Sequence, residues 1–161
     1  MPPGSADRRF AYHRAAELPA PEAADSIRRA RATARKASAI ALQDALDSIE
    51  ALGFRVQSAG IPCGERAIPK NLPIVLGSHP LIHTAEGVFF QQAVVFACER
   101  CGIPVISRPE RKVWLDAAAK CGLKEAGLRQ QIDGLRSSVG APWGTDQKVA
   151  TAFALAARNG G

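Results

Sequence analysis

The sequence predicts an α/β fold: a small parallel sheet of two to three strands, flanked by helices and preceded by a long basic N-terminal helix. Residues 54–63 and 103–107 have the alternating or β-branched character of short strands. Residues 79–101, between them, are long and apolar enough for a buried helix. With 161 residues, of which 47% are hydrophobic, the chain has enough apolar material for one core.

The first 25 residues differ in composition from the rest of the chain. They begin with a basic stretch and continue as alanine, proline and acid, which is typical of an extended lead-in rather than of a core. We therefore expect residues 1–25 to form a flexible arm, with a short edge strand at residues 8–13. Residues 26–161 are expected to form a single α/β domain.

The first predicted element of that domain is the long basic helix, over residues 26–52. Asp25 or Ser26 serves as its N-cap, and Gly53 stands where a left-handed residue is needed at the helix end. The second half of this helix carries an apolar stripe that must pack against another element, namely Leu42, Leu46, Ile49 and Leu52.

Two strands follow in the prediction, separated by a helix. Residues 54–63 come directly after a helix-ending glycine, and residues 64–73 hold a glycine and two prolines, which indicates a loop. The second strand, residues 103–107, lies between Gly102 and Pro109. Two strands joined through a helix form a right-handed crossover and a parallel pair, so the predicted sheet is Rossmann-like.

The helix between the strands begins well in the sequence. Ser78 is a suitable N-cap, Pro80 is tolerated in the first turn, and Gly102 ends the run. The alternative is a strand over residues 74–85, which their β-branched content favours. The remaining helices are predicted at residues 110–120, 124–137 and 146–158.

Positive charge is concentrated near the N-terminus. The formal net charge is +6, and the first 36 residues hold eight cations against four acids, which places +4 of it there. Such a cluster attracts nucleic acid or another polyanion. A solvated charged face is the preferred explanation, because the chain has few aromatic residues to stack on bases and no recognisable nucleic-acid-binding motif. The cations are Arg8, Arg9, Arg14, Arg28, Arg29, Arg31, Arg35 and Lys36.

Composition also bears on the compartment. The longest uninterrupted apolar stretches, such as residues 93–98, are far shorter than the roughly 20 residues needed to cross a bilayer, and the N-terminus lacks the apolar segment of a signal peptide. We expect a cytoplasmic protein with no membrane contact. Cys98 and Cys101 form a C-x-x-C at a helix C-terminus, where the dipole disfavours thiolate, so we expect free thiols rather than a redox pair or a four-cysteine zinc site.

Three polar side chains share one face of the helix predicted over residues 79–101. At about 100° per residue, His79, His83 and Glu86 fall within about 60° of one another. Two imidazoles one turn apart can share a metal ion, and a carboxylate one turn further supplies a third ligand or a general base. A structural role fits as well, with His79 near the helix start and Glu86 paired with an arginine.

Without a metal, the same residues can serve acid/base catalysis and anion binding. His83 and Glu86 are then the catalytic pair. Ser78 and His79 stand at the helix start, where free N–H groups and the helix dipole favour a phosphate. A divalent metal on His79, His83 and Glu86 remains the alternative, and the sequence does not identify the ion.

Charged residues elsewhere give two weaker candidates. Arg108 and Arg111 follow the second strand, at the edge where open parallel sheets bind ligands, and could hold a phosphate or a carboxylate. Asp146 and Lys148 begin the last helix and form a second candidate site, although the helix dipole alone explains an acid there.

The stretch LGSHPLIHTAEGVFF resembles the core of a family of uncharacterised bacterial proteins, which reads Ser-His-x-Leu-Ile-His-Thr-Ala-Glu-Gly. The resemblance extends over residues 26–157, through RARATARKASAIALQDAL upstream, ACERCGIPV downstream and a late DQK. It implies a bacterial source and a shared site, but no particular reaction. The residues that it carries over are Ser78, His79, His83, Thr84, Glu86 and Gly87, which makes Thr84 a further ligand-binding candidate.

This chain departs from that family's core at two places. Val88 stands where the family has an acid, and Gln91 or Gln92 stands near its arginine. If those two residues are needed for activity, this member has lost it. A fainter similarity to ribonuclease H-like nucleases matches Glu86 and Asp146 but lacks the aspartate that the first strand should supply.

Together these patterns predict a domain that recognises a phosphate-bearing small molecule and, as an enzyme, hydrolyses it. The competing hypothesis is a non-enzymatic nucleic-acid-binding or assembly protein that uses the basic helix. The sequence does not fix the substrate, the metal content or the oligomeric state.

Overall fold

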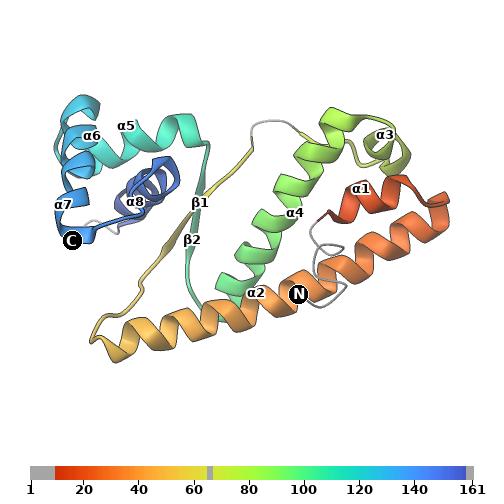
Figure 1. Cartoon of the computed structure of the whole chain (residues 1–161), viewed down its shortest axis with the longest axis horizontal. Coiled ribbons are helices and arrows are strands. Elements are labelled where there is room, and N and C mark those ends of the chain that lie inside the picture. Colours follow the sequence, from red (N-terminus) through yellow and green to blue (C-terminus); the bar gives the residue numbers. More distant parts are fainter. Residues whose placement is uncertain (1–9, 65–66, 159–161) are drawn as a thin grey trace. The chain divides into compact units, whose positions relative to one another are not determined.

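The computed structural model describes residues 10–64 and 67–158, and about 70% of these residues are helical (Figure 1). In chain order the elements are α1 (Ala11–Ala16), α2 (Ala20–Ala51), β1 (Ala59–Pro62), α3 (Leu72–Leu76), α4 (His79–Arg100), β2 (Val105–Arg108), α5 (Glu110–Lys120), α6 (Glu125–Gly134), α7 (Arg136–Val139) and α8 (Thr145–Ala157).

The prediction of a Rossmann-like α/β fold was wrong, because the protein is mostly helical. The described sheet consists only of β1 and β2, which pair in parallel with Ala59 opposite Val105. The crossover argument gave the right direction for this pair. However, only residues 59–62 of the 54–63 segment pair, and with four residues in each strand the ladder is too short to organise a sheet-based domain.

Most of the described part of the predicted arm is helical. Residues 11–16, expected as an edge strand in part, form α1, and α2 begins at Ala20 rather than near Ser26. Pro21 lies in the first turn of α2, where a proline costs no hydrogen bond, so it marks a helix start instead of a linker. Residues 1–9 of the predicted arm lie outside the described residues.

The helix ends were predicted more accurately than the strands. α4 and α5 match the predicted ranges to within one residue, and the rival strand over residues 74–85 is wrong because α3 and α4 occupy it. Gly53 and Gly102 adopt φ of 82° and 69°, the left-handed conformation that lets the chain leave a helix. The predicted helix at residues 124–137 is divided into α6 and α7.

The described residues cluster into two compact units. The first contains the described residues up to Asp44 and those from 64 to 97, and so includes α1, α3, most of α2 and most of α4. A small core forms where Ala15, Ala23 and Ile27 pack together. Around it lie Tyr12, Leu72 and Leu76, so α1 and α3 are held through a few apolar contacts each.

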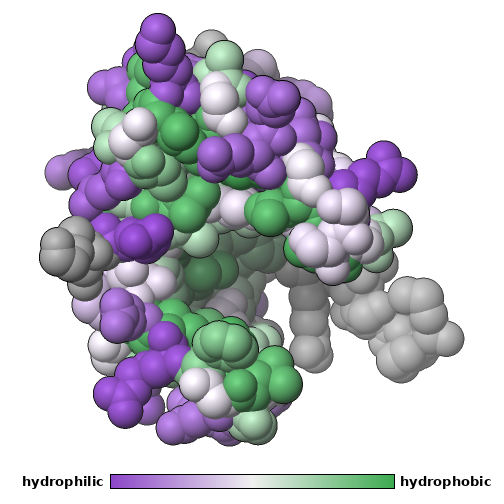
Figure 2. Space-filling view, turned by 90° about the vertical axis from the view of Figure 1, so that its left-hand side faces the viewer, coloured by the Kyte–Doolittle hydropathy of each residue, from purple (hydrophilic) through white to green (hydrophobic). Residues whose placement is uncertain are grey.

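The second unit contains residues 45–63 and the described residues from Cys98 onward. Its core is built from α5, α6 and α8, around Val113, Leu128 and Phe153. α8 lies against β1 so closely that a Cβ added at Gly60 would be 2.5 Å from the backbone oxygen of Phe153. Figure 2 shows the face of the protein that is on the left-hand side of Figure 1, where hydrophobic side chains are interspersed with hydrophilic ones.

One helix of the described chain, α4, is long and apolar enough to cross a membrane by length and composition. The core helix of a soluble protein passes the same test, and 39% of the apolar window of α4 is buried inside the protein. The expectation of a cytoplasmic protein without membrane contact therefore stays a prediction.

Candidate functional site

All three histidines of the chain meet in the first unit. His79 and His83 come from the first two turns of α4, and His13 comes from α1, 66 residues earlier. Each offers one ring nitrogen, and these three atoms lie within 4.8 Å of one another. Their ring centroids are 4.4 to 5.8 Å apart, with interplanar angles of 68° to 86°. We call these three residues the histidine cluster.

Helix geometry brings the two α4 histidines together. Because they are four residues apart, their side chains lie one turn apart on the same face, as the sequence predicted. The Nε2 atoms of His79 and His83 are 3.2 Å apart, which allows a hydrogen bond if one of them carries the proton. Both side chains are exposed, so the cluster is open to solvent on this side.

Glu86 lies behind His13. Its Oε1 is 3.4 Å from His13 Nδ1, and the residue is only 7% exposed. With Nδ1 directed at the carboxylate, His13 keeps Nε2 for another partner. A carboxylate that holds the outer nitrogen of a histidine is the usual arrangement behind metal-binding imidazoles, where it fixes the tautomer and raises the basicity of the ring.

The same carboxylate caps α1. Phe10, at the N-cap position, makes no side-chain capping hydrogen bond. Instead, Glu86 Oε1 accepts the backbone N–H groups of Tyr12 at 2.7 Å and His13 at 3.3 Å. These are first-turn donors with no partner within the helix, and the helix dipole favours a negative charge there. Glu86 is thus an N-cap supplied by a residue more than 70 positions away.

The cluster fits a metal ion in both chemistry and spacing. Two tetrahedral ligands with Zn–N bonds of about 2.0–2.1 Å are about 3.3 Å apart, close to the His79–His83 distance of 3.2 Å. The remaining separations, within 4.8 Å, can close by rotation of the exposed rings. Three imidazoles with a fourth position open to solvent are the ligand set of a catalytic rather than a structural zinc site.

The burial of the Glu86 carboxylate also favours a cation at this site. The Oε2 atom of Glu86 is buried and has no hydrogen-bond partner among the described residues. An ionised carboxylate in this position needs a compensating cation nearby. The histidine beside it can supply that charge either as imidazolium or by carrying a metal ion.

The structure thus changes the roles that the sequence suggested. His79 and His83 lie together, but Glu86 contacts His13 instead of completing a His-His-Glu ligand set. His13 was missed because it is far away in the chain and fell in a segment read as an edge strand. One signal could have found it: the chain has only three histidines, and two of them already form an i, i+4 pair.

The other predicted residues on α4 have local partners. The Thr84 hydroxyl donates to the Pro80 carbonyl at 2.9 Å, a contact within the helix. The Ser78 carbonyl accepts the N–H of Ile82 at 2.9 Å, which closes the first turn of α4. Gly87 is exposed, and Val88, where the similar family has an acid, is half-buried.

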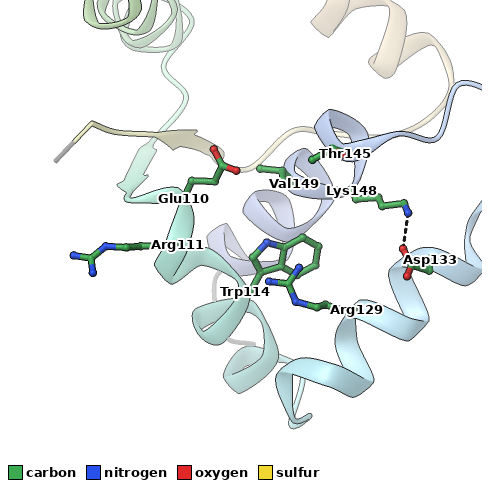
Figure 3. Close-up of a pocket in the computed structure, with 8 residues that line it drawn as sticks. All are labelled: Glu110, Arg111, Trp114, Arg129, Asp133, Thr145, Lys148 and Val149. Atoms are coloured by element: carbon green, nitrogen blue, oxygen red, sulfur yellow. Dashed lines mark ion pairs between the residues drawn. The ribbon is translucent and has the colours of Figure 1, made fainter. Parts of the chain in front are cut away.

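The second unit holds the remaining predicted residues. Arg108 pairs with Asp116 at 3.4 Å. Arg111 and Lys148 line one pocket of about 750 Å³ between α5, α6 and α8 (Figure 3). In the figure, Arg111 points away from the others. Asp146 is absent from this lining, so only part of the second candidate pair reaches it.

The cations of this pocket are largely neutralised. Lys148 pairs with Asp133 at 2.7 Å (Figure 3), and Arg129 pairs with Glu125 at 2.7 Å. The Arg129 guanidinium also lies 3.9 Å from the centre of the Trp114 ring, a cation–π contact. These contacts hold α5, α6 and α8 together. This structural role is enough to explain why the charged residues are present.

Cys98 and Cys101 lie at the C-terminal end of α4, as expected, and all four cysteines of the chain are free thiols. Cys98 is buried, and desolvation by this burial raises the pKa of its thiol, with a smaller contribution from Cys101. A raised pKa suppresses the thiolate that redox exchange requires.

Comparison with known proteins adds no relative. No protein-family model matches the chain, and no curated protein and no solved structure matches it at a significant level.

Proposed function

We propose that this protein is a metal-dependent hydrolase whose metal ion is held by His13, His79 and His83. The observation that carries the proposal is the meeting of all three histidines of the chain, with the buried Glu86 carboxylate behind one of them. Imidazole ligands favour Zn²⁺ and other late divalent metals over Mg²⁺ or Ca²⁺.

The open position gives the proposed centre its reaction. A water molecule bound to Zn²⁺ has its pKa lowered to about 7 and becomes a hydroxide nucleophile at neutral pH. His79 is the first residue of α4, so the positive end of that helix dipole lies beside the metal. The dipole opposes the cation but stabilises a hydroxide or an anionic substrate bound to it.

Metal content of protein made without a polyhistidine tag tests the proposal. We expect about one equivalent of zinc per chain by elemental analysis, and its loss in the His13→Ala, His79→Ala and His83→Ala variants. Replacement by Co²⁺ separates ligand types, because a tetrahedral site of nitrogen ligands has visible absorption without the thiolate charge-transfer band that cysteine ligands would add.

Two results would overturn this assignment. One is tag-free protein that binds neither zinc nor cobalt. The other is a cobalt complex with thiolate bands that persists in the three histidine variants, since it would place the metal on cysteines. Hydrolysis is then tested with a chromogenic phosphate ester and a chromogenic carboxylate ester, with and without chelator, on wild type and His83→Ala.

A second proposal, nucleic-acid binding, rests on the surface of α2. Arg28, Arg29, Arg35 and Lys36 are exposed there. Two of them have partners: Arg28 pairs with Asp25 at 2.7 Å, and Arg35 lies 4.9 Å from the centre of the Phe96 ring. Salt-dependent binding of a DNA or RNA oligonucleotide that is lost when these four cations are changed to glutamine would favour it; binding unaffected by those changes would exclude it.

A further inference from the structure

A groove of about 450 Å³ lies on α1, α2 and α4, and two of these helices, α1 and α4, carry the histidine cluster. Ala11 and Arg14 of α1 contribute to one side, α2 contributes a row of residues, and Phe90 comes from α4. The volume is within the range of small-molecule sites, about 300–1,000 Å³. The groove lies entirely within the first unit.

Small residues on α2 create this space. Ala30, Ala34 and Ala37 follow one another at four- and three-residue spacing, and therefore share a face of the helix. Their methyl groups leave a channel that a larger side chain would fill. Phe90 adds an apolar ring that is 46% exposed. This exposed ring gives the groove an apolar surface for a ligand.

The charge in the groove has one sign. Two guanidinium groups, of Arg14 and Arg29, line it, and no acidic residue does so among the described lining residues. Guanidinium binds phosphate and carboxylate through paired N–H donors, and two such groups match the charge of about −1.5 to −2 that a phosphate monoester carries at pH 7. The groove therefore suits a dianionic head better than a monocarboxylate.

The groove also adjoins the histidine cluster along the chain. Arg14 directly follows His13 in α1. On α4, Phe90 lies four residues after Glu86, which continues the face that carries His79 and His83. From His83 to Phe90 the rise is about 10 Å, at about 1.5 Å per residue. A molecule of that length can contact both the groove and the cluster.

We infer that the substrate is an organic phosphate monoester with an apolar body, and that its phosphate end binds in this groove, which Arg14, Arg29 and Phe90 line. This end of the substrate does not react. The inference rests on the proposed function in one respect: the bound molecule is a substrate only if the histidine cluster performs the reaction. Binding in the groove itself requires no metal, since none of its lining residues belongs to the cluster.

The test uses 2-naphthyl phosphate as the probe and isothermal titration calorimetry on the full chain, both stripped of metal by chelator and reloaded with Zn²⁺. We expect binding in both forms, with 2-naphthol and inorganic phosphate each at least tenfold weaker. Arg29→Gln should weaken the probe about tenfold, while Lys36→Gln, an exposed cation on the same helix outside the groove, should not.

A second pair of variants tests the location through shape. Ala30→Leu puts a larger side chain into the groove and should abolish binding, whereas Ala32→Leu makes the same change at an exposed position of α2 outside it. Binding that survives Arg29→Gln and Ala30→Leu, or that Lys36→Gln weakens equally, overturns the inference. A protein that binds zinc normally but not the probe refutes the groove alone. A protein that binds the probe but takes up no zinc refutes the proposed function alone.

Discussion

Glu86 is expected to have two roles, capping α1 and supporting metal binding by His13. Two substitutions of Glu86 affect these roles differently and so distinguish them. Glu86→Ala removes the acceptor for the N–H groups of Tyr12 and His13 and for the His13 ring. A hydrogen bond to a charged group contributes about 1.5–3 kcal/mol and an N-cap typically about 1 kcal/mol. Since two of the three contacts are long, 3.3 and 3.4 Å, we expect a loss of about 3 kcal/mol in the free energy of unfolding.

Glu86→Gln retains one carbonyl oxygen and therefore most of the cap, but it removes the charge behind His13. Stability should fall by only about 1 kcal/mol. Replacing a carboxylate that supports a metal-binding histidine costs about 10- to 100-fold in metal affinity. Glutamine should thus reduce zinc affinity by that factor while the protein stays folded, and alanine should reduce both quantities.

The assay has two readouts. Urea denaturation followed by circular dichroism gives the free energy of unfolding without metal, and competition with a chromophoric chelator gives the zinc affinity. Glu99→Gln makes the same chemical change at an exposed position of α4 and is the control. The reasoning fails if Glu86→Ala is as stable as wild type, or if Glu86→Gln binds zinc as tightly as Glu99→Gln does.

Three further predictions concern the second unit. Gly60→Ala should cost about 1–3 kcal/mol, because its Cβ would meet the Phe153 backbone at 2.5 Å, whereas Gly127→Ala, with no atom within 4 Å in α6, should stabilise by about 0.5–1 kcal/mol; equal thermal shifts for the two variants would contradict this. Trp143→Phe should cost about 1 kcal/mol in urea denaturation, because the indole N–H that donates to the Ile132 carbonyl at 2.9 Å is lost, and an unchanged midpoint would show that this bond adds nothing. Because burial raises the pKa of Cys98, its thiol should be alkylated by iodoacetamide at pH 8 more slowly than that of Cys63, as read by peptide mass spectrometry. The same preference for the neutral thiol stabilises the fold below the pKa of the unfolded chain, about 8.5. This contribution to stability is lost as the pH rises through the higher pKa of the folded protein. Alkylation of Cys98 first would show that its surroundings favour the thiolate.

Local signals predicted the helices and misled us about the sheet. Glycine at a helix end has a direct backbone cause, so the ends at Gly53, Gly102 and Gly122 could be read from the sequence, and all three have positive φ. Strand pairing depends on a partner that the local sequence does not contain. Residues 54–58 alternate like a strand, yet only 59–62 find a partner, in β2.

The site was half predictable for the same reason. His79, His83 and Glu86 lie within eight residues of one helix, so helix geometry alone placed them on one face. His13 reaches them only because α1 folds back against α4, which is a tertiary event. The prolines at 19 and 21 suggested a linker there, and the residue that anchors α1, Glu86, is itself on the distant helix.

α1 shows how the candidate site and the fold depend on each other. A helix of six residues is far too short to be stable alone in water, since isolated helices need about 12–15 residues. Its stability must come from the burial of Ala11 and Ala15, from the Glu86 cap, and from whatever His13 contacts. A metal ion on His13, His79 and His83 would join α1 to α4 by a third connection. At a free metal concentration of a hundred times the dissociation constant, it would add about 2.7 kcal/mol to the free energy of unfolding. Because Arg14 of the groove stands on the same short helix, order in α1 governs both the proposed metal centre and the proposed substrate groove.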